Sequence, residues 1–210
     1  CGVIKDEHCR KILEGLEQIQ VDFKAGTWDL QLQEEDVQMN VERYLIDKVG
    51  IENGGRMHTT RSRNDQVPSD TKLYTREALV SMIENLQTFV ANILEIAKDH
   101  TETIMPGYTH LQPAQPVRWS HWLLSHSAAW KRDVERLKDL KNRVNVMPLG
   151  SGALAGHPFN IDRVRLANDL QFDDISLNSM DAVSDRDFIA EYLFCTSLLA
   201  THLSRFAEDL

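Results

Sequence analysis

The sequence predicts an all-α fold built from a few long helices. Apolar residues recur every three or four positions over most of the 210-residue chain, which is the spacing of amphipathic helices. No run of five residues alternates between apolar and polar side chains as a half-buried strand does. Long helices with narrow apolar stripes cannot all bury those stripes in a compact monomer of this size, so we expect a bundle shared between copies in a homo-oligomer.

The first two expected helices are short, and a long one follows. The short helices span about 6–20 and 34–49, and the long helix runs from about 69 to 100, roughly 45 Å at 1.5 Å per residue. Pro68 precedes the long helix, at a position where a first-turn proline is tolerated. The apolar seam of this helix consists of Leu79, Met82, Leu86, Phe89, Ile93 and Ile96.

Two more long helices are expected in the second half of the chain. The first spans about 117–145 and is ended by Pro148 and Gly150. Its apolar side carries Trp119, Leu123, His126, Trp130, Val134, Leu137 and Val144. The second spans about 185–210 and carries Ile189, Tyr192, Thr196, Leu199, Leu203, Phe206 and Leu210. It lacks a closing Gly, Asn or Pro, so we expect the native helix to continue beyond this chain.

Composition is typical of a soluble globular protein and excludes several classes. Hydrophobic residues make up 42% and charged residues 26% of the chain, and the formal net charge of -9 opposes binding to nucleic acid or to an anionic membrane. No stretch has the apolar length of a membrane span, and the first residues lack the order of a signal peptide. Cys1, Cys9 and Cys195 form no C-x-x-C pair, which argues against a disulfide framework or structural zinc and fits a cytoplasmic protein.

The most informative segment for function is Arg61-Ser62-Arg63-Asn64. Two guanidinium groups, a hydroxyl and a carboxamide offer the directed donors that bind carboxylates. The segment lies at the expected N-terminus of a helix, where free N–H groups and the helix dipole also favour anions. A small dicarboxylate would fit this cluster. The same residue types also occur in solvated loops that lead into a helix, so the cluster alone does not decide between the two.

A second polar cluster is Thr109-His110-Leu111-Gln112, which we expect in a turn-rich loop between helices. His110 can titrate near neutrality, and a proton carrier together with an anion-binding cluster indicates acid-base chemistry on a carboxylic acid. Loop histidines are also commonly bystanders, so this cluster is not decisive either.

Three other motifs are interpreted as structural. The segment 150–156 nearly matches the dinucleotide fingerprint G-x-G-x-x-A, but a long helix and Pro148 precede it, so we expect a loop that approaches other backbone closely or lines a cavity. His121 and His126 are five residues apart and do not share a helical face at metal-ligand spacing, so no metal is expected. The segment 181–187 is interpreted as a capping and salt-bridge loop at the start of the last helix.

Four segments in this order resemble the argininosuccinate lyase family of the fumarase/aspartase superfamily. They contain RSRND at 61–65, PGYTHLQ at 106–112, PLGSGALAG at 148–156 and DAVSDRDF at 181–188. The resemblance spans nearly the whole chain. It implies a long-helix bundle of the fumarase/aspartase type whose central helices are shared in a homotetramer. Residues 1–60 would be part of an N-terminal helical domain, and residues 61–210 part of the central bundle domain, whose C-terminal part is absent from this chain.

The resemblance also implies a reaction, the reversible β-elimination of argininosuccinate to L-arginine and fumarate in arginine biosynthesis or the urea cycle. It implies no metal or organic cofactor, and sites that combine segments of different subunits. The implied substrate-binding residues are Arg61, Ser62, Arg63, Asn64, Thr109 and Gln112. The implied catalytic residues are His110, which transfers a proton, and Thr109 beside it.

Some expected parts of the site lie outside the chain. The resemblance implies a mobile loop beyond Leu210 whose serine is the partner acid or base, and further substrate contacts before Cys1, so we expect a piece of a longer enzyme. Thr60 stands where the family usually has glycine, Pro68 is unusual, and Gln38 replaces a common histidine. A catalytically silent relative of the delta-crystallin type and a superfamily lyase with another succinyl substrate are the alternatives.

Overall fold

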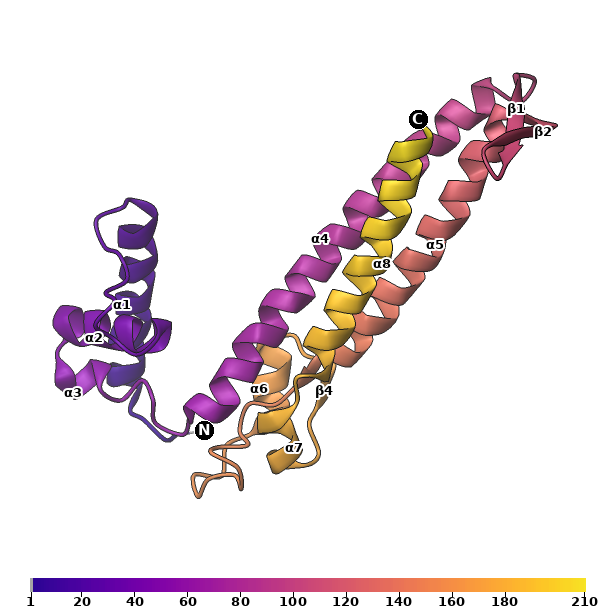
Figure 1. The fold of residues 1–210 in the computed structure, drawn as a ribbon. Helices are drawn as coiled ribbons and strands as arrows, with labels where there is room; N and C mark the ends of the chain where they lie inside the picture. Colours follow the sequence, from indigo (N-terminus) through magenta and orange to yellow (C-terminus); the bar gives the residue numbers. More distant parts are fainter. Residues whose placement is uncertain (1) are drawn as a thin grey trace.

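The computed structural model describes residues 2–210, most of which are helical. Figure 1 shows the long helices 63–99, 119–144 and 187–209 side by side in an elongated bundle, with a smaller cluster of helices near one end. The predicted all-α class is confirmed, and within the described residues its exceptions are two small two-stranded sheets. No helix in the described part of the chain is long and apolar enough to cross a membrane.

The N-terminal helices pack around a small core of their own and are α1 (Asp6–Lys24), α2 (Val37–Val49) and α3 (Ile51–Gly54). Gly15 allows α1 and α2 to approach closely, because a Cβ atom there would lie 2.4 Å from Cδ1 of the fully buried Leu45. The Asp36 side chain caps α2 by accepting a hydrogen bond from the Met39 N–H at 2.7 Å. This cap explains why α2 begins later than the predicted start at about residue 34.

The longest helix, α4 (Arg63–Asp99), begins six residues before its predicted start. Ser62 is its N-cap and forms a capping box with Asp65, which satisfies N–H groups at the helix start. Pro68 therefore lies in the second turn, where its missing N–H leaves the Asn64 carbonyl without its usual helical donor. The prediction that Pro68 occupies the first turn is wrong, and the capping box is the reason.

Two further helices complete the bundle within two residues of their predicted bounds, α5 (Trp119–Val144) and α8 (Asp187–Asp209). The predicted seam of α4 drifts near its C-terminal end, where Ile96 is 43% exposed and Ala97 only 4% exposed. An α-helix has 3.6 residues per turn, so a 3.5-residue repeat rotates away from the buried face over several turns. The largest buried side chain of the shared core is Trp130 on α5.

The segment predicted as a loop is an antiparallel hairpin of two strands, β1 (Ile104–Thr109) and β2 (Gln112–Arg118). Thr109 pairs with Gln112, and the turn residues His110 and Leu111 have φ values of 51° and 62°. Two consecutive positive φ values define a type I′ turn, whose twist matches that of a hairpin. Prolines in both strands and the lack of an Asn-Gly turn concealed this hairpin in the sequence.

The chain between α5 and α8 forms a small layer at the base of the bundle. Its elements are β3 (Val146–Met147), α6 (Arg163–Asp169), β4 (Asp174–Ile175) and α7 (Ser179–Ser184). The two short strands pair in parallel, and Met147, Ala167 and Phe172 form the core of the layer. None of these elements was predicted, because such short segments contain too few periodic positions.

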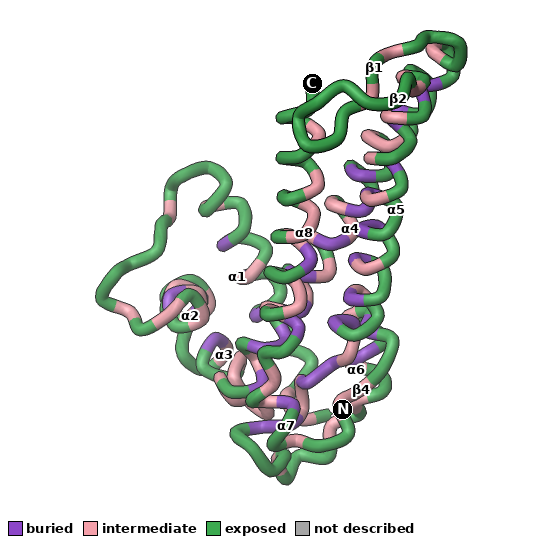
Figure 2. Tube along the Cα trace, turned by 45° about the vertical axis from the view of Figure 1, so that its right-hand side comes forward, coloured by how far each residue is buried: buried purple, intermediate pink, exposed green. Residues whose placement is uncertain are grey.

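Burial is concentrated where α4, α5 and α8 face one another, as Figure 2 shows. Their outer faces keep large apolar side chains exposed. Leu193 and Phe194 on α8 are each 58% exposed, and Leu124 on α5 is 45% exposed. Adjacent exposed apolar residues such as the pair on α8 are typical of a surface that packs against another protein.

Candidate functional site

The predicted site residues fall into two groups at opposite ends of α4. The first group, at its N-terminus, is Arg61, Ser62, Arg63 and Asn64. The second group is Thr109, His110 and Gln112, at the tip of the β1–β2 hairpin that follows the C-terminus of α4 (Figure 1). The 37 residues of α4 span about 55 Å at 1.5 Å per residue. A single copy of the chain therefore does not bring the two groups together.

Both arginines of the first group already have partners within the chain. Arg61 Nη2 donates to the Met57 carbonyl, and burial lowers the pKa of the Arg61 guanidinium. Arg63 Nε lies 2.6 Å from Asp36 Oδ2, and Arg63 Nη1 donates to Gln66 Oε1 at 3.0 Å. These contacts orient both side chains. They leave Nη2 as the Arg63 guanidinium nitrogen best placed to donate to a ligand.

Ser62 and Asn64 are positioned by the start of α4. Ser62 Oγ accepts a hydrogen bond from the Asn64 N–H at 3.3 Å. The Asn64 carboxamide is exposed, and its Nδ2 donates to the Ala153 carbonyl at 2.8 Å. This long-range bond fixes the plane of the amide at a helix N-terminus, where the partial positive charge favours an anion.

Asp65 ties the start of α4 to the glycine-rich loop 148–156. Its side chain is fully buried. Oδ1 accepts the Ser62 N–H at 3.0 Å, and Oδ2 accepts the N–H groups of Gly150 at 2.9 Å and Gly152 at 2.8 Å. The sequence did not link this carboxylate to the glycine-rich loop, because Asp65 is more than eighty residues from Gly150 and Gly152.

The hydrogen bonds from Gly150 and Gly152 to Asp65 also argue against a dinucleotide site in the segment 150–156. β3, α6 and β4 do form a small β-α-β unit, which the sequence did not predict. However, α6 begins at Arg163, seven residues after Gly156, whereas a dinucleotide site needs a helix that starts at the glycines. The loop N–H groups are also bound to a carboxylate rather than open to a phosphate. The loop is therefore structural in this chain.

Polar pairs beside the arginine loop, which comprises residues 55–62 between α3 and α4, were not predicted. His58 Nε2 lies 2.7 Å from Glu42 Oε2, and burial lowers the pKa of His58 although Glu42 opposes this shift. Gln38 Nε2 donates to Asp70 Oδ2 at 2.7 Å. Both pairs connect α2 to the arginine loop or to α4, so they are tertiary contacts that no sequence spacing could have indicated.

The hairpin tip presents the second group to solvent. Thr109, His110 and Gln112 are exposed, and Leu111 between them is 92% exposed. The segment 104–117 contains no Lys, Arg, Asp or Glu, although a quarter of the chain is charged. A two-stranded hairpin with little packing around it is at best marginally stable in water.

The segment 181–187, predicted as a capping and salt-bridge loop at the start of the last helix, has one of these two roles. Asn178 caps α7 by accepting the N–H groups of Met180 and Asp181 at 3.0 and 3.1 Å. Asp185 Oδ2 lies 3.0 Å from Nζ of the buried Lys72 on α4. The salt-bridge part of the interpretation is therefore confirmed. The capping part is wrong, because residues 181–184 belong to α7 and the N-cap of α8, Arg186, makes no side-chain cap hydrogen bond.

Comparison with known proteins identifies the family. The model of the lyase family matches residues 1–210. The chain belongs to the lyase family. The argininosuccinate lyases of Alkaliphilus metalliredigens and Candida albicans are 50% and 46% identical to it over 209 residues, which cover 100% of this chain and 45% of each relative. The resemblance found in the sequence is thus confirmed, and this chain spans about half the length of the curated relatives it matches.

Solved structures agree with the fold of this chain. A crystal structure of EDDS lyase with formate has a TM-score of 0.88 and 30% identity, covering 99% of this chain and 40% of that one. An EDDS lyase variant with bound fumarate has the same values. A class II fumarase from Schistosoma mansoni has a TM-score of 0.81 at 17% identity, covering 99% of this chain and 52% of that one, which supports the fold alone. The long-helix bundle of the fumarase/aspartase type is confirmed.

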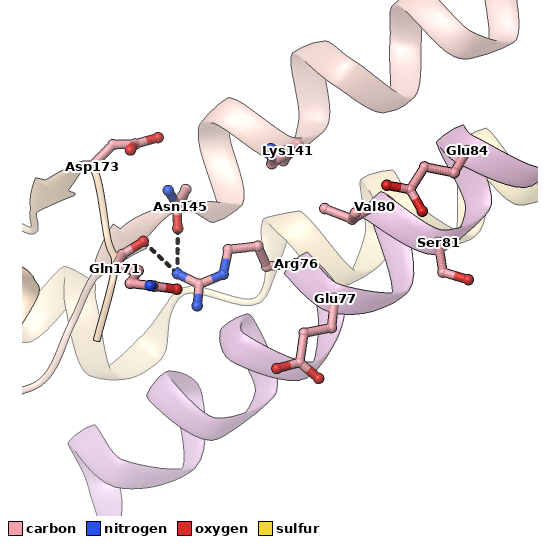
Figure 3. Close-up of a pocket in the computed structure, with 9 residues that line it drawn as sticks. All are labelled: Arg76, Glu77, Val80, Ser81, Glu84, Lys141, Asn145, Gln171 and Asp173. Carbon is pink, nitrogen blue, oxygen red and sulfur yellow. Dashed lines mark hydrogen bonds between the residues drawn. The ribbon is translucent and has the colours of Figure 1, made fainter. Parts of the chain in front are cut away.

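Of two hollows in the surface of this chain, one lies away from the predicted site and the other meets it at Arg61. One cavity of about 500 Å³ lies beside α4 and the end of α5. Figure 3 shows Arg76 pointing across it, where Nη1 donates to Asn145 Oδ1 at 2.9 Å and to the Gln171 carbonyl at 2.6 Å. Arg76 therefore ties α4 to the base layer. A second crevice of about 750 Å³ between α1 and α6 is lined mainly by apolar side chains and includes Arg61.

The described residues give no metal-binding arrangement. Within 2–210, no three His, Cys, Asp or Glu side chains gather in a group that could hold a metal ion. Over the same range Cys9 is an exposed free thiol and Cys195 a buried one. Cys1 lies outside the described residues.

Proposed function

We propose that the protein containing this chain is an argininosuccinate lyase, which splits argininosuccinate into L-arginine and fumarate by reversible β-elimination. The observation that carries the proposal is the 50% identity to an argininosuccinate lyase over the whole chain. The neighbour with fumarate bound supports the same product class by its structure. The acidic composition and the free thiols fit a cytoplasmic enzyme.

The N-terminus of α4 holds the succinyl carboxylates in this proposal. The Ser62 hydroxyl, Arg63 Nη2 and the Asn64 amide supply directed donors and acceptors, and Arg61 adds a positive field from its half-buried position. The helix dipole favours the same negative charge. Because the chain as a whole carries a net charge of -9, this local potential suits a small diacid and not a polyanion.

The hairpin tip supplies the proton transfer. A β-elimination needs a base for the carbon-bound proton, stabilisation of the resulting carbanion, and an acid for the departing guanidinium nitrogen. We assign one proton transfer to His110, with Thr109 and Gln112 as substrate contacts on either side of the turn. The other proton-transfer group is not assigned to a residue of this chain.

A complete site requires more than one copy of the chain. The two groups are separated by the length of α4, about 55 Å, so the hairpin of one copy must reach the α4 N-terminus of another. The exposed uncharged hairpin and the apolar outer faces of α8 and α5 support this arrangement, which we infer to be a homotetramer.

The full-length protein tests the reaction directly. Addition of argininosuccinate should produce fumarate, which is followed by its ultraviolet absorbance, and no fumarate would refute the proposal. His110→Asn should lower kcat by at least about 100-fold, because general acid-base groups contribute about 10²–10⁴-fold. His121→Asn is the matched control, since His121 is also exposed and lies just beyond the hairpin. An active His110→Asn would exclude His110 as the proton carrier.

Mixed oligomers test the sharing of sites. Arg63→Ala and His110→Asn should each be inactive alone. When the two variants are unfolded together and reassembled, some sites receive an intact α4 N-terminus from one copy and an intact hairpin from the other, so activity should return. Failure of activity to return, with assembly confirmed by light scattering, would show that both groups must come from the same copy.

A further inference from the structure

Asp65 is a buried carboxylate that the proposed chemistry does not use. Its two oxygens accept three backbone N–H groups, one from the cap of α4 and two from the loop 148–156. Bonds from N–H groups to a carboxylate are stronger than those to a neutral acceptor, and the N-terminus of α4 adds a favourable dipole. The chain therefore places a permanent acceptor where three donors converge.

The opposite side of the same loop is held by a cation. Arg163 Nε donates to the Leu149 carbonyl at 3.0 Å, and its Nη2 lies 3.4 Å from the Met147 carbonyl. Gly150 has a φ of 95°, and a Cβ atom there would lie 2.9 Å from Arg163 Cδ, so the loop backbone is in direct contact with the arginine. Asp65 thus binds the N–H groups of Gly150 and Gly152, and Arg163 binds the carbonyl of Leu149 in the same loop and that of Met147 just before it.

The loop held in this way determines the position of Asn64. Its Nδ2 donates to the Ala153 carbonyl, one residue beyond the Gly152 N–H that Asp65 holds. On the other side, Ser179 Oγ donates to the Leu154 carbonyl at 2.7 Å and ties the loop to α7. A shift of the loop would therefore rotate the exposed amide of Asn64.

We propose that Asp65 is a positioning residue for the carboxylate-binding end of α4. Its buried carboxylate fixes the loop 148–156, and the loop fixes the orientation of the Asn64 carboxamide toward the substrate. The inference rests on the proposed lyase function and adds to it a residue that touches no substrate but determines how tightly one is bound.

Asp65→Asn is the sharpest test because it keeps the shape and changes one acceptor into a donor. Whichever way the new amide is turned, its NH₂ group faces either the Ser62 N–H or the two glycine N–H groups, so one set of bonds is lost. In the full-length protein we expect KM for argininosuccinate to rise at least about tenfold with a smaller fall in kcat, since small misplacements of a binding group weaken binding strongly. Hydrogen exchange at Gly150 and Gly152 should also become faster.

Asp133→Asn is the matched control. Asp133 is 2% exposed, accepts from Arg136 at 3.0 Å and lies 2.6 Å from His202 Nδ1, and none of these contacts touches the loop 148–156. It should lower the melting temperature while KM stays within about twofold of the wild type. A KM rise of equal size in both variants would reduce Asp65 to a general stabilising residue and overturn the inference.

Two further results would overturn it. One is a folded Asp65→Asn protein with wild-type KM and wild-type exchange in the loop. If Asp65→Asn does not fold, Asp65→Glu keeps the charge and the capping position but displaces the oxygens, and a wild-type KM there would count equally against the inference. A wild-type protein that makes no fumarate refutes the proposed function instead, and the exchange rates of Gly150 and Gly152 then decide whether Asp65 holds the loop.

Discussion

Replacing Thr60 with glycine should stabilise this protein, although it removes a side chain next to the candidate site. Thr60 has a φ of 75°, in the left-handed region that β-branched residues rarely adopt. Within the described residues, no hydrogen bond involves its hydroxyl, so the substitution breaks none. The family that the sequence resembles usually has glycine at this position, and the positive φ gives the physical reason.

The change in the free energy of unfolding follows from two opposing contributions. The left-handed conformation costs an L-residue about 1–2 kcal/mol, which glycine does not incur. Glycine loses about 0.5–1 kcal/mol through its greater freedom in the unfolded chain. The difference predicts a gain of about 0.5–1 kcal/mol for Thr60→Gly. Thr60→Asn should also stabilise, since Asn tolerates this region, whereas Thr60→Val keeps the β-branch and should match the wild type.

Thermal unfolding of the full-length variants at one protein concentration measures the order of their stabilities. The expected rise for Thr60→Gly is at most about 4 °C, since the scale of about 2–4 °C per kcal/mol for 150–250 residues becomes smaller in the longer full-length protein. Circular dichroism of the helices reports the transition. A Thr60→Gly protein that melts below the wild type, or a Thr60→Val protein that melts clearly above it, would refute the strain argument.

Three further substitutions test the packing and electrostatics. His202→Ala removes one hydrogen-bond partner of the buried Asp133 carboxylate and should lower the free energy of unfolding by about 2–3 kcal/mol in urea titrations. No loss would show that this hydrogen bond does not stabilise the fold. Gly152 has a φ of 62°, and a Cβ atom there would lie 2.5 Å from the Gly156 carbonyl oxygen. Gly152→Ala should therefore lower the melting temperature and raise KM. An unchanged melting temperature and KM would mean that the loop can relax. Burial lowers the pKa of His126, so the stability of the fold falls as the pH drops from about 6.5 through the lower pKa of His126 in the folded state. His126→Phe should make this fall less steep in thermal melts at successive pH values. An unchanged dependence of stability on pH would exclude His126 as its cause.

Sequence periodicity predicted the long helices well because their folding signals are local. α5 and α8 end within two residues of the predicted bounds, since their apolar stripes continue to the last turn. The start of α4 was misplaced because Pro68 was taken as its first turn, while the capping box of Ser62 and Asp65 begins the helix earlier. The hairpin was missed because its prolines and its His110-Leu111 turn do not follow the usual strand and turn preferences.

The candidate site was predictable in its residue types and not in its contacts. Arg63 and Asn64 stand out in the sequence because directed donors at a helix start favour carboxylates. Their actual partners, Asp36 and the Ala153 carbonyl, come from other elements. The domain boundary at residue 60 stays a prediction, as do the roles assigned to the site residues.

Local signals at the two ends of α4 determine what a single copy can do. The capping box of Ser62 and Asp65 places the proposed anion-binding group at one end, and the two-residue turn at His110 and Leu111 places the proposed proton carrier beyond the other. A continuous helix between them is too stiff to fold back, so their separation of about 55 Å is a direct result of its length. Any chemistry that needs both groups must therefore be performed by an assembly, and the exposed apolar faces of the bundle are where that assembly would form.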